Sequence, residues 1–393
     1  MNTLTLEYIK SILPPRPDNS HKMTFGHVLN IAGSLHYRGA AYLSSLSALR
    51  VGAGYVTLAS SPSVCDSVSA LTPNIVTFAL RTLSPLSVHS LQRTANLHLK
   101  DAQIVDVQTL SPQAVLQLRD KLTQASAISI GSGLSIGQST DQCIDITAIN
   151  TELTVDVDVT LCTEMSAEIS TDLNSDLNSD LNSDLRSELP ICNDIKDNQP
   201  HSNELIPPQG NHGFFYALLN EIQTCTKPVI FDADALNFIS HLLNPPVQFG
   251  TTTVTLPNKS IITPHPKELA RLLNMDVATL QTQRMHFARL AAKQLNTIVV
   301  LKGKNTVITD GNDVFINPTG NSALAKAGTG DVLTGMISGF CAQGVSPINA
   351  ACLGVYLHGL AGNIAAEDLS QYGMLASDLL SYIPKAILKV LAI

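Results

Sequence analysis

The chain has 393 residues, of which 44% are hydrophobic and 14% charged, so it is long enough to bury one large core or two ordinary ones. The formal net charge is −8, but residues 151–205 hold 13 acidic and only 2 basic side chains, and the rest of the chain is close to neutral at +3. A nucleic-acid surface needs clustered basic residues, and nothing in this charge pattern favours one.

Cysteine usage and hydropathy predict a cytoplasmic protein. The seven cysteines are an odd number without a C-x-x-C pair, which indicates reduced thiols rather than a zinc site or a disulfide framework. The first 19 residues lack the pattern of a signal peptide, and no apolar stretch approaches the roughly 20 residues that cross a bilayer. The apolar run 350–361 carries Tyr356 and His358, and we expect it to form a buried helix rather than to contact a membrane.

Strand-like and helical patterns alternate along the chain. In chain order we predict a strand at 28–32, a helix at 39–51, strands at 55–59, 127–130, 228–231 and 261–263, a helix ending near 273, a strand at 297–301, and helices at 331–341, 348–367 and 377–390. Strand, helix and strand in succession form parallel crossover units. We therefore predict an α/β protein, a three-layer α/β/α sandwich with a mostly parallel central sheet, in which residues 1–393 form a single domain.

One acidic segment, from about residue 138 to 210, interrupts this alternation. Ser-Asp-Leu-Asn occurs at 175 and 179 and Ser-Asp-Leu-Arg at 183, and a leucine recurs every four residues from Leu173 to Leu189. An amphipathic helix for a partner is one interpretation. We favour a disordered insertion, because Asn, Ser and Asp are poor helix-interior residues, the like charges repel, and the entropy of closing a longer loop grows slowly.

The strongest chemical signal is the stretch from Asn317 to Gly335, where a glycine-rich turn leads into a helix. Free backbone N–H groups at a helix start bind anions, and Gly328 and Gly330 let the backbone approach a phosphate closely. Asp331 lies in the first turn beside this anion site. Its carboxylate could deprotonate a substrate hydroxyl that attacks a phosphate. Alternatively, Asp331 is merely the N-cap residue of the helix.

Two common nucleotide motifs are incomplete here. Residues 303–306 lack the glycine spacing of a Walker A loop, and the glycines of 131–137 depart from the dinucleotide fingerprint by one position. A tight loop at Gly131 and Gly133 that binds a phosphate or the substrate remains an alternative interpretation.

Polar residues at strand ends are further candidates. Asp232 and Asp234 either bind a ligand at the sheet edge or cap the next helix. We expect Lys302 to contact phosphate rather than to form a surface salt bridge, and Glu268 to be a first-turn helix acid rather than to act on a metal-bound water. Lys326 either contacts phosphate or points to solvent.

Seven blocks, in order along the chain, carry a resemblance to a known family. They are Gly33-Ser34 with Tyr37-Arg-Gly39-Ala40-Ala41, Arg50-Val-Gly52-Ala-Gly54, Gly131-Ser-Gly133-Leu134, Asp232-Ala-Asp234-Ala-Leu-Asn237, Thr263-Pro-His265-Pro-Lys-Glu268, Leu301-Lys302-Gly303, and Asn317 through Gly335. Together they resemble the ADP/ATP-dependent NAD(P)H-hydrate dehydratases, carbohydrate-kinase-like repair enzymes of the ribokinase superfamily. The resemblance implies a ribokinase-like sandwich.

The resemblance also implies roles for individual residues. Ala40 or Ala41, Gly133 and His265 would contact the hydrated nicotinamide nucleotide, and Asp331 would contact its ring hydroxyl and act as the catalytic base. The adenine nucleotide would be held by Lys302, Gly303, Lys304, Asn305, Thr306, Gly328, Thr329 and Gly330, with Gly328 and Gly330 forming the anion hole.

The implied reaction is ADP-dependent dehydration of the S-epimer of hydrated NADH or NADPH, with release of AMP and phosphate. ADP or ATP would be the phosphoryl donor, with Mg²⁺. The resemblance further suggests a homo-oligomer, such as a tetramer. Only about 25 residues precede the first matching block, so we expect the NAD(P)HX epimerase to be a separate protein.

Departures from the family pattern affect the nucleotide fit more than the reaction. Ser132 replaces the usual Pro, Lys267 replaces the usual Gly, and the sequence of the loop after Asn321 differs from the family pattern. Two further functions stay open: a small-molecule kinase of the same superfamily, such as a hydroxyethylthiazole-type kinase, and a non-catalytic nucleotide-binding protein whose acidic insertion recruits a partner.

Overall fold

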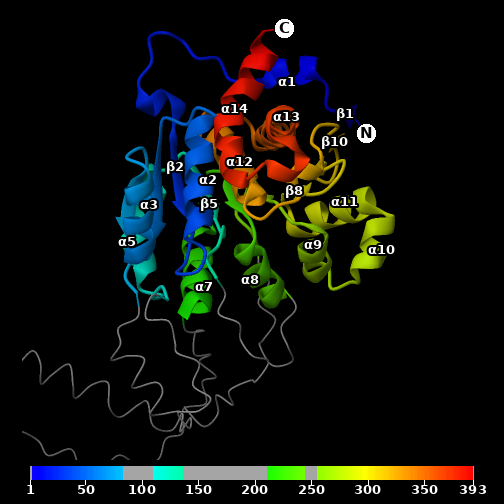
Figure 1. The fold of residues 1–393 in the computed structure, drawn as a ribbon. Helices are drawn as coiled ribbons and strands as arrows, with labels where there is room; N and C mark the ends of the chain where they lie inside the picture. Colours follow the sequence, from blue (N-terminus) through cyan, green and yellow to red (C-terminus); the bar gives the residue numbers. More distant parts are fainter. Residues whose placement is uncertain (1, 83–108, 136–209, 244–254, 393) are drawn as a thin grey trace, which may run out of the picture. The chain divides into compact units, whose positions relative to one another are not determined.

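A ten-stranded sheet organises the part of the chain that the computed structural model describes, residues 2–82, 109–135, 210–243 and 255–392 (Figure 1). Its strand order is β1-β10-β9-β8-β7-β6-β5-β2-β3-β4. The strands are β1 (Asn2–Thr3), β2 (His27–Ile31), β3 (Tyr55–Ser60), β4 (Val76–Ala79), β5 (Ala127–Ile130), β6 (Val229–Phe231), β7 (Ser260–Ile262), β8 (Ile298–Leu301), β9 (Val307–Thr309) and β10 (Val314–Ile316). Pairing is parallel from β4 through to β8, and β9 pairs antiparallel with both β8 and β10.

Helices cover both faces of this sheet. One face packs against α1 (Leu6–Ile12), α2 (Arg38–Arg50), α3 (Pro62–Leu71), α12 (Thr329–Ala342), α13 (Pro347–Gly373) and α14 (Ala376–Leu391). The other packs against α5 (Ala114–Gln124), α7 (Gly210–Ile222), α8 (Asp234–Leu243), α9 (Pro266–Leu272), α10 (Val277–Thr282) and α11 (Arg284–Leu295). Two short 3₁₀ turns, η1 (Lys22–Phe25) and η3 (Ser322–Leu324), complete the described elements.

Alternation along the strands divides the core into two layers. In β6, Ile230 packs into one layer, whereas Val229 and Phe231 pack into the other. Successive side chains of a strand point to opposite faces, so a strand covered on both faces, such as β6, is largely apolar. The expected three-layer α/β/α sandwich with a mostly parallel sheet is confirmed.

The order of the parallel strands reverses direction between β2 and β5. From β2 the chain continues outward to β3 and β4, and from β5 it continues the opposite way to β6, β7 and β8. The loops that leave β2 and β5 meet at this point, since the Gly33 amide donates to the Ser132 carbonyl oxygen over 2.8 Å. Open α/β sheets bind ligands in the crevice at such a switch point, beyond the carboxyl ends of the strands.

The predicted strands are all present within a residue or two. The helix predicted from 331 begins earlier, at Thr329, and the one predicted to end at 367 continues to Gly373 across a non-helical Ser370. The acidic segment 138–210 lies outside the described residues, apart from Gly210 at the start of α7, so its expected disorder and the extent of the single domain stay predictions.

Helix α13 contains the apolar run that was expected to be buried. By length and composition alone α13 could cross a bilayer, contrary to the expectation that no segment would qualify. However, 72% of its most apolar stretch is buried inside the protein, which confirms a core helix. Within the described ranges the cysteines, Cys65, Cys225, Cys341 and Cys352, are free thiols, as predicted.

Candidate functional site

Asp232 lies at the centre of a polar cluster beyond the carboxyl ends of β6, β7 and β8. It directly follows β6 and is 1% exposed. Thr263, just after β7, donates its hydroxyl to Asp232 Oδ1 over 2.7 Å, and Thr334 of α12 donates to Oδ2 over 2.8 Å. A buried carboxylate is tolerated only when donors surround it, and this one has donors on both oxygens.

Lys302, the first residue after β8, supplies the positive charge of the cluster. Its Nζ lies 2.8 Å from Asp232 Oδ1 and 4.0 Å from Glu268 Oε2, and its side chain is 20% exposed. Burial alone would lower the pKa of this ammonium group, but Asp232 and Glu268 outweigh burial and hold the pKa above its usual value. Lys302 therefore forms a largely buried ion pair and not a surface salt bridge.

Asp331 occupies the third position of α12 and faces the same cluster. Burial raises its pKa to about 7; the charges of Asp232 and Asp234 add to this, while the Ser132 hydroxyl and Lys302 oppose it. A carboxylate whose pKa is near neutrality suits a general base at physiological pH. The N-cap residue of α12 is Gly328, so the interpretation of Asp331 as the N-cap residue is wrong.

The start of α12 is open to an anion. Gly328 has a φ of +91°, a conformation that glycine adopts without strain, and it leaves the first helical N–H groups free of a side-chain cap. A Cβ on Gly330 would lie 3.5 Å from Lys302 Nζ, which places the ammonium group beside the first turn of the helix. The Thr329 amide bonds the Lys326 carbonyl oxygen over 3.4 Å, so the next amides of the first turn, together with the helix dipole and the lysine, can bind a phosphate.

His265 and Glu268 begin α9 next to this cluster. They form a capping box, in which the His265 amide donates to Glu268 Oε2 over 2.7 Å and the Glu268 amide donates to His265 Nδ1 over 3.2 Å. Glu268 is thus a first-turn helix acid, as expected; burial raises its pKa to about 7 although Lys302 opposes this rise. The imidazole of His265 is 47% exposed, and its Nε2 lies 3.4 Å from Glu268 Oε1. Partial burial, with Lys302 and Arg271 nearby, lowers its pKa, and the exposed part of the ring can contact a ligand.

The tight turn after β5 forms another side of the candidate site. Gly133 has a φ of +66°, and a Cβ there would lie 2.8 Å from the Cβ of Ala40, so the turn packs directly against α2. The Ser135 amide donates to Asp234 Oδ2 over 2.9 Å, and Asn211 of α7 donates to the carbonyl oxygens of Leu134 and Ser135. Burial raises the pKa of Asp234.

The adenine-nucleotide residues predicted between β8 and β9 form an exposed turn. Gly303, Lys304 and Asn305 are exposed, while Thr306 is buried and donates its hydroxyl to the Gly303 carbonyl oxygen over 2.8 Å. Arg284 of α11 donates to the carbonyl oxygens of Leu301 and Lys302 and so supports the turn.

The structure brings together most of the residues singled out in the sequence. Lys302, Gly330, Asp331 and Glu268 lie around Asp232. Ala41 is fully buried against Gly33, so Ala40 is the better placed of the two alanines for a ligand.

Lys326 and Thr329, on either side of Gly328, both bond to protein groups. Lys326 Nζ donates to the Tyr372 carbonyl oxygen over 2.5 Å. Thr329 is buried, and its carbonyl oxygen bonds His358, whose pKa burial lowers to about 4, as expected of a core histidine.

Sequence reasoning missed Thr263 and Thr334 as members of the site. Both lay within the seven blocks, Thr263 at a strand end and Thr334 three residues after Asp331, hence on the same face of the helix. Asn211 and Arg284 carried no comparable signal, because they act from helices outside those blocks.

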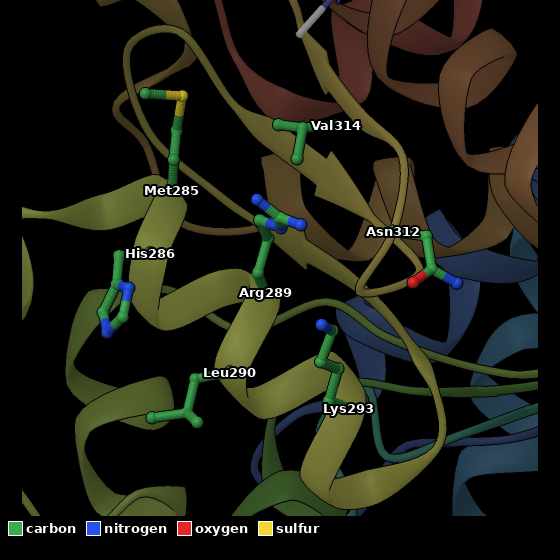
Figure 2. Close-up of a pocket in the computed structure, with 7 residues that line it drawn as sticks. All are labelled: Met285, His286, Arg289, Leu290, Lys293, Asn312 and Val314. Carbon is green, nitrogen blue, oxygen red and sulfur yellow. The ribbon is translucent and has the colours of Figure 1, made fainter.

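The described residues contain no group of three or more His, Cys, Asp or Glu side chains arranged to hold a metal ion. A hollow of about 590 Å³ lies elsewhere, between α11 and the β9–β10 hairpin (Figure 2). It is lined by Met285, His286, Arg289, Leu290, Lys293, Asn312 and Val314. None of these belongs to the predicted site, and the hollow does not contribute to it.

Comparison with known sequences gives a family match over most of the chain. The profile of the NAD(P)H-hydrate dehydratase family matches residues 28–171 and 209–385. A bifunctional NAD(P)H-hydrate repair enzyme of Moorella thermoacetica is 31% identical over 386 residues, which cover 97% of this chain. The chain spans about half, 53%, of that relative's length.

Comparison with solved structures agrees. The ADP/ATP-dependent NAD(P)H-hydrate dehydratase from Bacillus subtilis, co-crystallized with ATP/Mg²⁺, has a TM-score of 0.61 and 25% identity, and the match covers 99% of this chain and 98% of that one. A ribokinase-like superfamily protein from Enterococcus faecalis has a TM-score of 0.64 and 21% identity, over 99% of this chain and 96% of that one. The latter similarity supports the ribokinase-like fold.

Proposed function

The chain belongs to the NAD(P)H-hydrate dehydratase family, and on this premise we propose that it dehydrates the S-epimer of hydrated NADH and NADPH with ADP as phosphoryl donor. The products are NADH or NADPH, AMP and phosphate. The observation that carries the proposal is Asp331, a carboxylate with a pKa of about 7 in the first turn of a helix whose start is open to phosphate, with Lys302 beside it.

The first chemical step is a phosphoryl transfer. Asp331 accepts the proton of the ring hydroxyl, whose oxygen then attacks the terminal phosphorus of ADP and displaces AMP. Lys302 and the free N–H groups of α12 stabilise the charge that develops on the phosphoryl oxygens. Asp331 must be ionised for this step, which its pKa of about 7 permits at neutral pH.

The second step is elimination. Hydroxide is a poor leaving group, whereas phosphate is a good one, and the lone pair of the ring nitrogen expels the phosphate as the C–O bond breaks. The adjacent ring carbon then loses a proton to water, which restores the double bond of the dihydronicotinamide. Gly133, Ala40 and His265 would position the hydrated ring, and positioning supplies much of the rate.

The remaining assignments rest on the family and on general chemistry. ATP is the alternative donor. Mg²⁺ would neutralise phosphate charge, and it would be held chiefly by the nucleotide because the described residues offer no ligand cluster of their own. We include in the proposal a homotetramer in the cytoplasm that acts beside an NAD(P)HX epimerase and binds neither nucleic acid nor membrane.

The test is a repair assay. The protein is incubated with (S)-hydrated NADH and ADP, and absorbance of the reduced nicotinamide is followed. We expect absorbance to return with stoichiometric AMP and phosphate. A kinase of the hydroxyethylthiazole type would instead leave a stable phosphorylated product, and a purely nucleotide-binding protein would bind ADP without turnover. No return of absorbance with ADP or ATP would refute the proposal.

A further inference from the structure

Asp232 has no role in the two steps above, yet it is the most highly connected carboxylate of the site. Its three donors come from three different elements: Thr263 after β7, Lys302 after β8 and Thr334 within α12. Because ionised groups are strongly disfavoured in a protein interior, a carboxylate that is 1% exposed needs a reason to be there.

The contact with Lys302 determines where the ammonium group lies. Lysine is a flexible side chain that carries a point charge, so its position depends on its partners. Asp232 holds Nζ at 2.8 Å, beside Gly330 in the first turn of α12, whereas the next carboxylate, Glu268, is 4.0 Å away. Without Asp232, Nζ would lose its nearest anionic partner and would be held only by the weaker attraction of Glu268 and Asp331.

The contact with Thr334 determines how α12 is turned. Thr334 follows Asp331 by three residues, so the two side chains share one face of the helix. A hydrogen bond of 2.8 Å from Thr334 to Asp232 therefore adds to the packing of α12 against α2 in holding the direction in which Asp331 projects. One carboxylate thus sets the position of the cation and the orientation of the base.

We propose that Asp232 is a positioning residue for phosphoryl transfer, which acts through Lys302 and α12 and touches neither nucleotide. The inference rests on the proposed function. It predicts that the effect of removing the Asp232 charge on nucleotide binding depends on the presence of Lys302.

The experiment is a double-mutant cycle of ADP binding, measured by calorimetry on the full chain with Asp232→Asn, Lys302→Met and the two combined. A hydrogen bond to a charged group contributes enough that we expect each single change to weaken ADP binding about 10- to 100-fold. The combined variant should bind ADP no more weakly than Lys302→Met alone, because Asp232 acts through the lysine. Asp276→Asn, the same change at an exposed N-cap of α10, is the matched control and should bind ADP normally.

Steady-state kinetics give a second readout. In Asp232→Asn we expect kcat to fall about 100-fold, as misplaced catalytic groups do, while the KM for the hydrated nucleotide stays within about twofold. Because loss of folded protein would also lower the apparent kcat without changing KM, each rate is divided by the folded fraction measured by urea unfolding. Should Asp232→Asn fail to fold, Thr334→Val removes one donor with little change of shape, and its smaller loss of kcat serves in its place.

Wild-type ADP affinity in Asp232→Asn, or a combined loss equal to the product of the two single losses, would overturn the inference and leave the proposed function standing. Conversely, a non-additive cycle in a protein that repairs no hydrated nucleotide would support the positioning of Lys302 and refute only the proposed function.

Discussion

Replacing Asp331 with Asn should nearly abolish turnover and at the same time stabilise the fold above neutral pH. The carboxylate is needed as a base, but the folded protein holds it in a site that disfavours its charge, since burial and Asp232 raise its pKa to about 7 from the usual 3.8. Asn keeps the shape of the side chain and removes both the proton acceptor and the charge.

The two effects have calculable sizes. Loss of a general base lowers kcat by about 10²- to 10⁴-fold, equivalent to about 3–5 kcal/mol of barrier. Because the folded-state pKa lies above the unfolded one, the wild-type protein loses stability as pH rises from about 4 through about 7. The upper bound of that loss is about 4 kcal/mol, and since Asp331 is not fully buried we expect Asp331→Asn to gain about 1–2 kcal/mol at pH 8.

The assay combines repair kinetics with urea unfolding at pH 5 and pH 8, in the absence of nucleotide. Asp378→Asn is the matched control, because Asp378 holds the same third position in α14 but lies outside the site and accepts from the Leu375 amide. It should lose up to about 1 kcal/mol at pH 8 as a helix-capping acid is removed. If Asp331→Asn kept the full rate, or were less stable than wild type at pH 8, the reasoning would be wrong.

Further predictions follow from the same geometry. Gly133→Ala puts a Cβ 2.6 Å from that of Tyr37 at a φ of +66°, and should cost about 1–3 kcal/mol by urea unfolding, whereas Gly39→Ala, with open space around it, should be neutral or stabilising. His265→Gln should raise the KM for the hydrated nucleotide severalfold with kcat little changed; an unaltered KM would exclude the contact. Burial lowers the pKa of His358 to about 4, so the neutral ring favours the folded state, and this stability is lost as pH falls from about 6.5 to about 4. The Tm of His358→Gln, measured by thermal unfolding, should lack this part of the pH dependence.

Local patterns in the chain were sufficient for the strands, the sandwich and the anion site. Strands β5 and β6 are short, mainly apolar runs in the sequence, because helices cover both of their faces. The glycines at the start of α12 indicated a backbone that a ligand can approach closely. These features depend on neighbouring residues only, so the linear sequence carries them.

What the sequence by itself determined, then, was the fold class and the identity of the candidate base, Asp331. Only the tertiary structure showed that Asp232, Thr263, Lys302 and Thr334 converge, and that Asp331 has a pKa near 7. The physical reason is that a pKa and a buried hydrogen-bond network depend on desolvation and on charges brought together by the sheet, from strand ends and a helix that span about a hundred residues of chain.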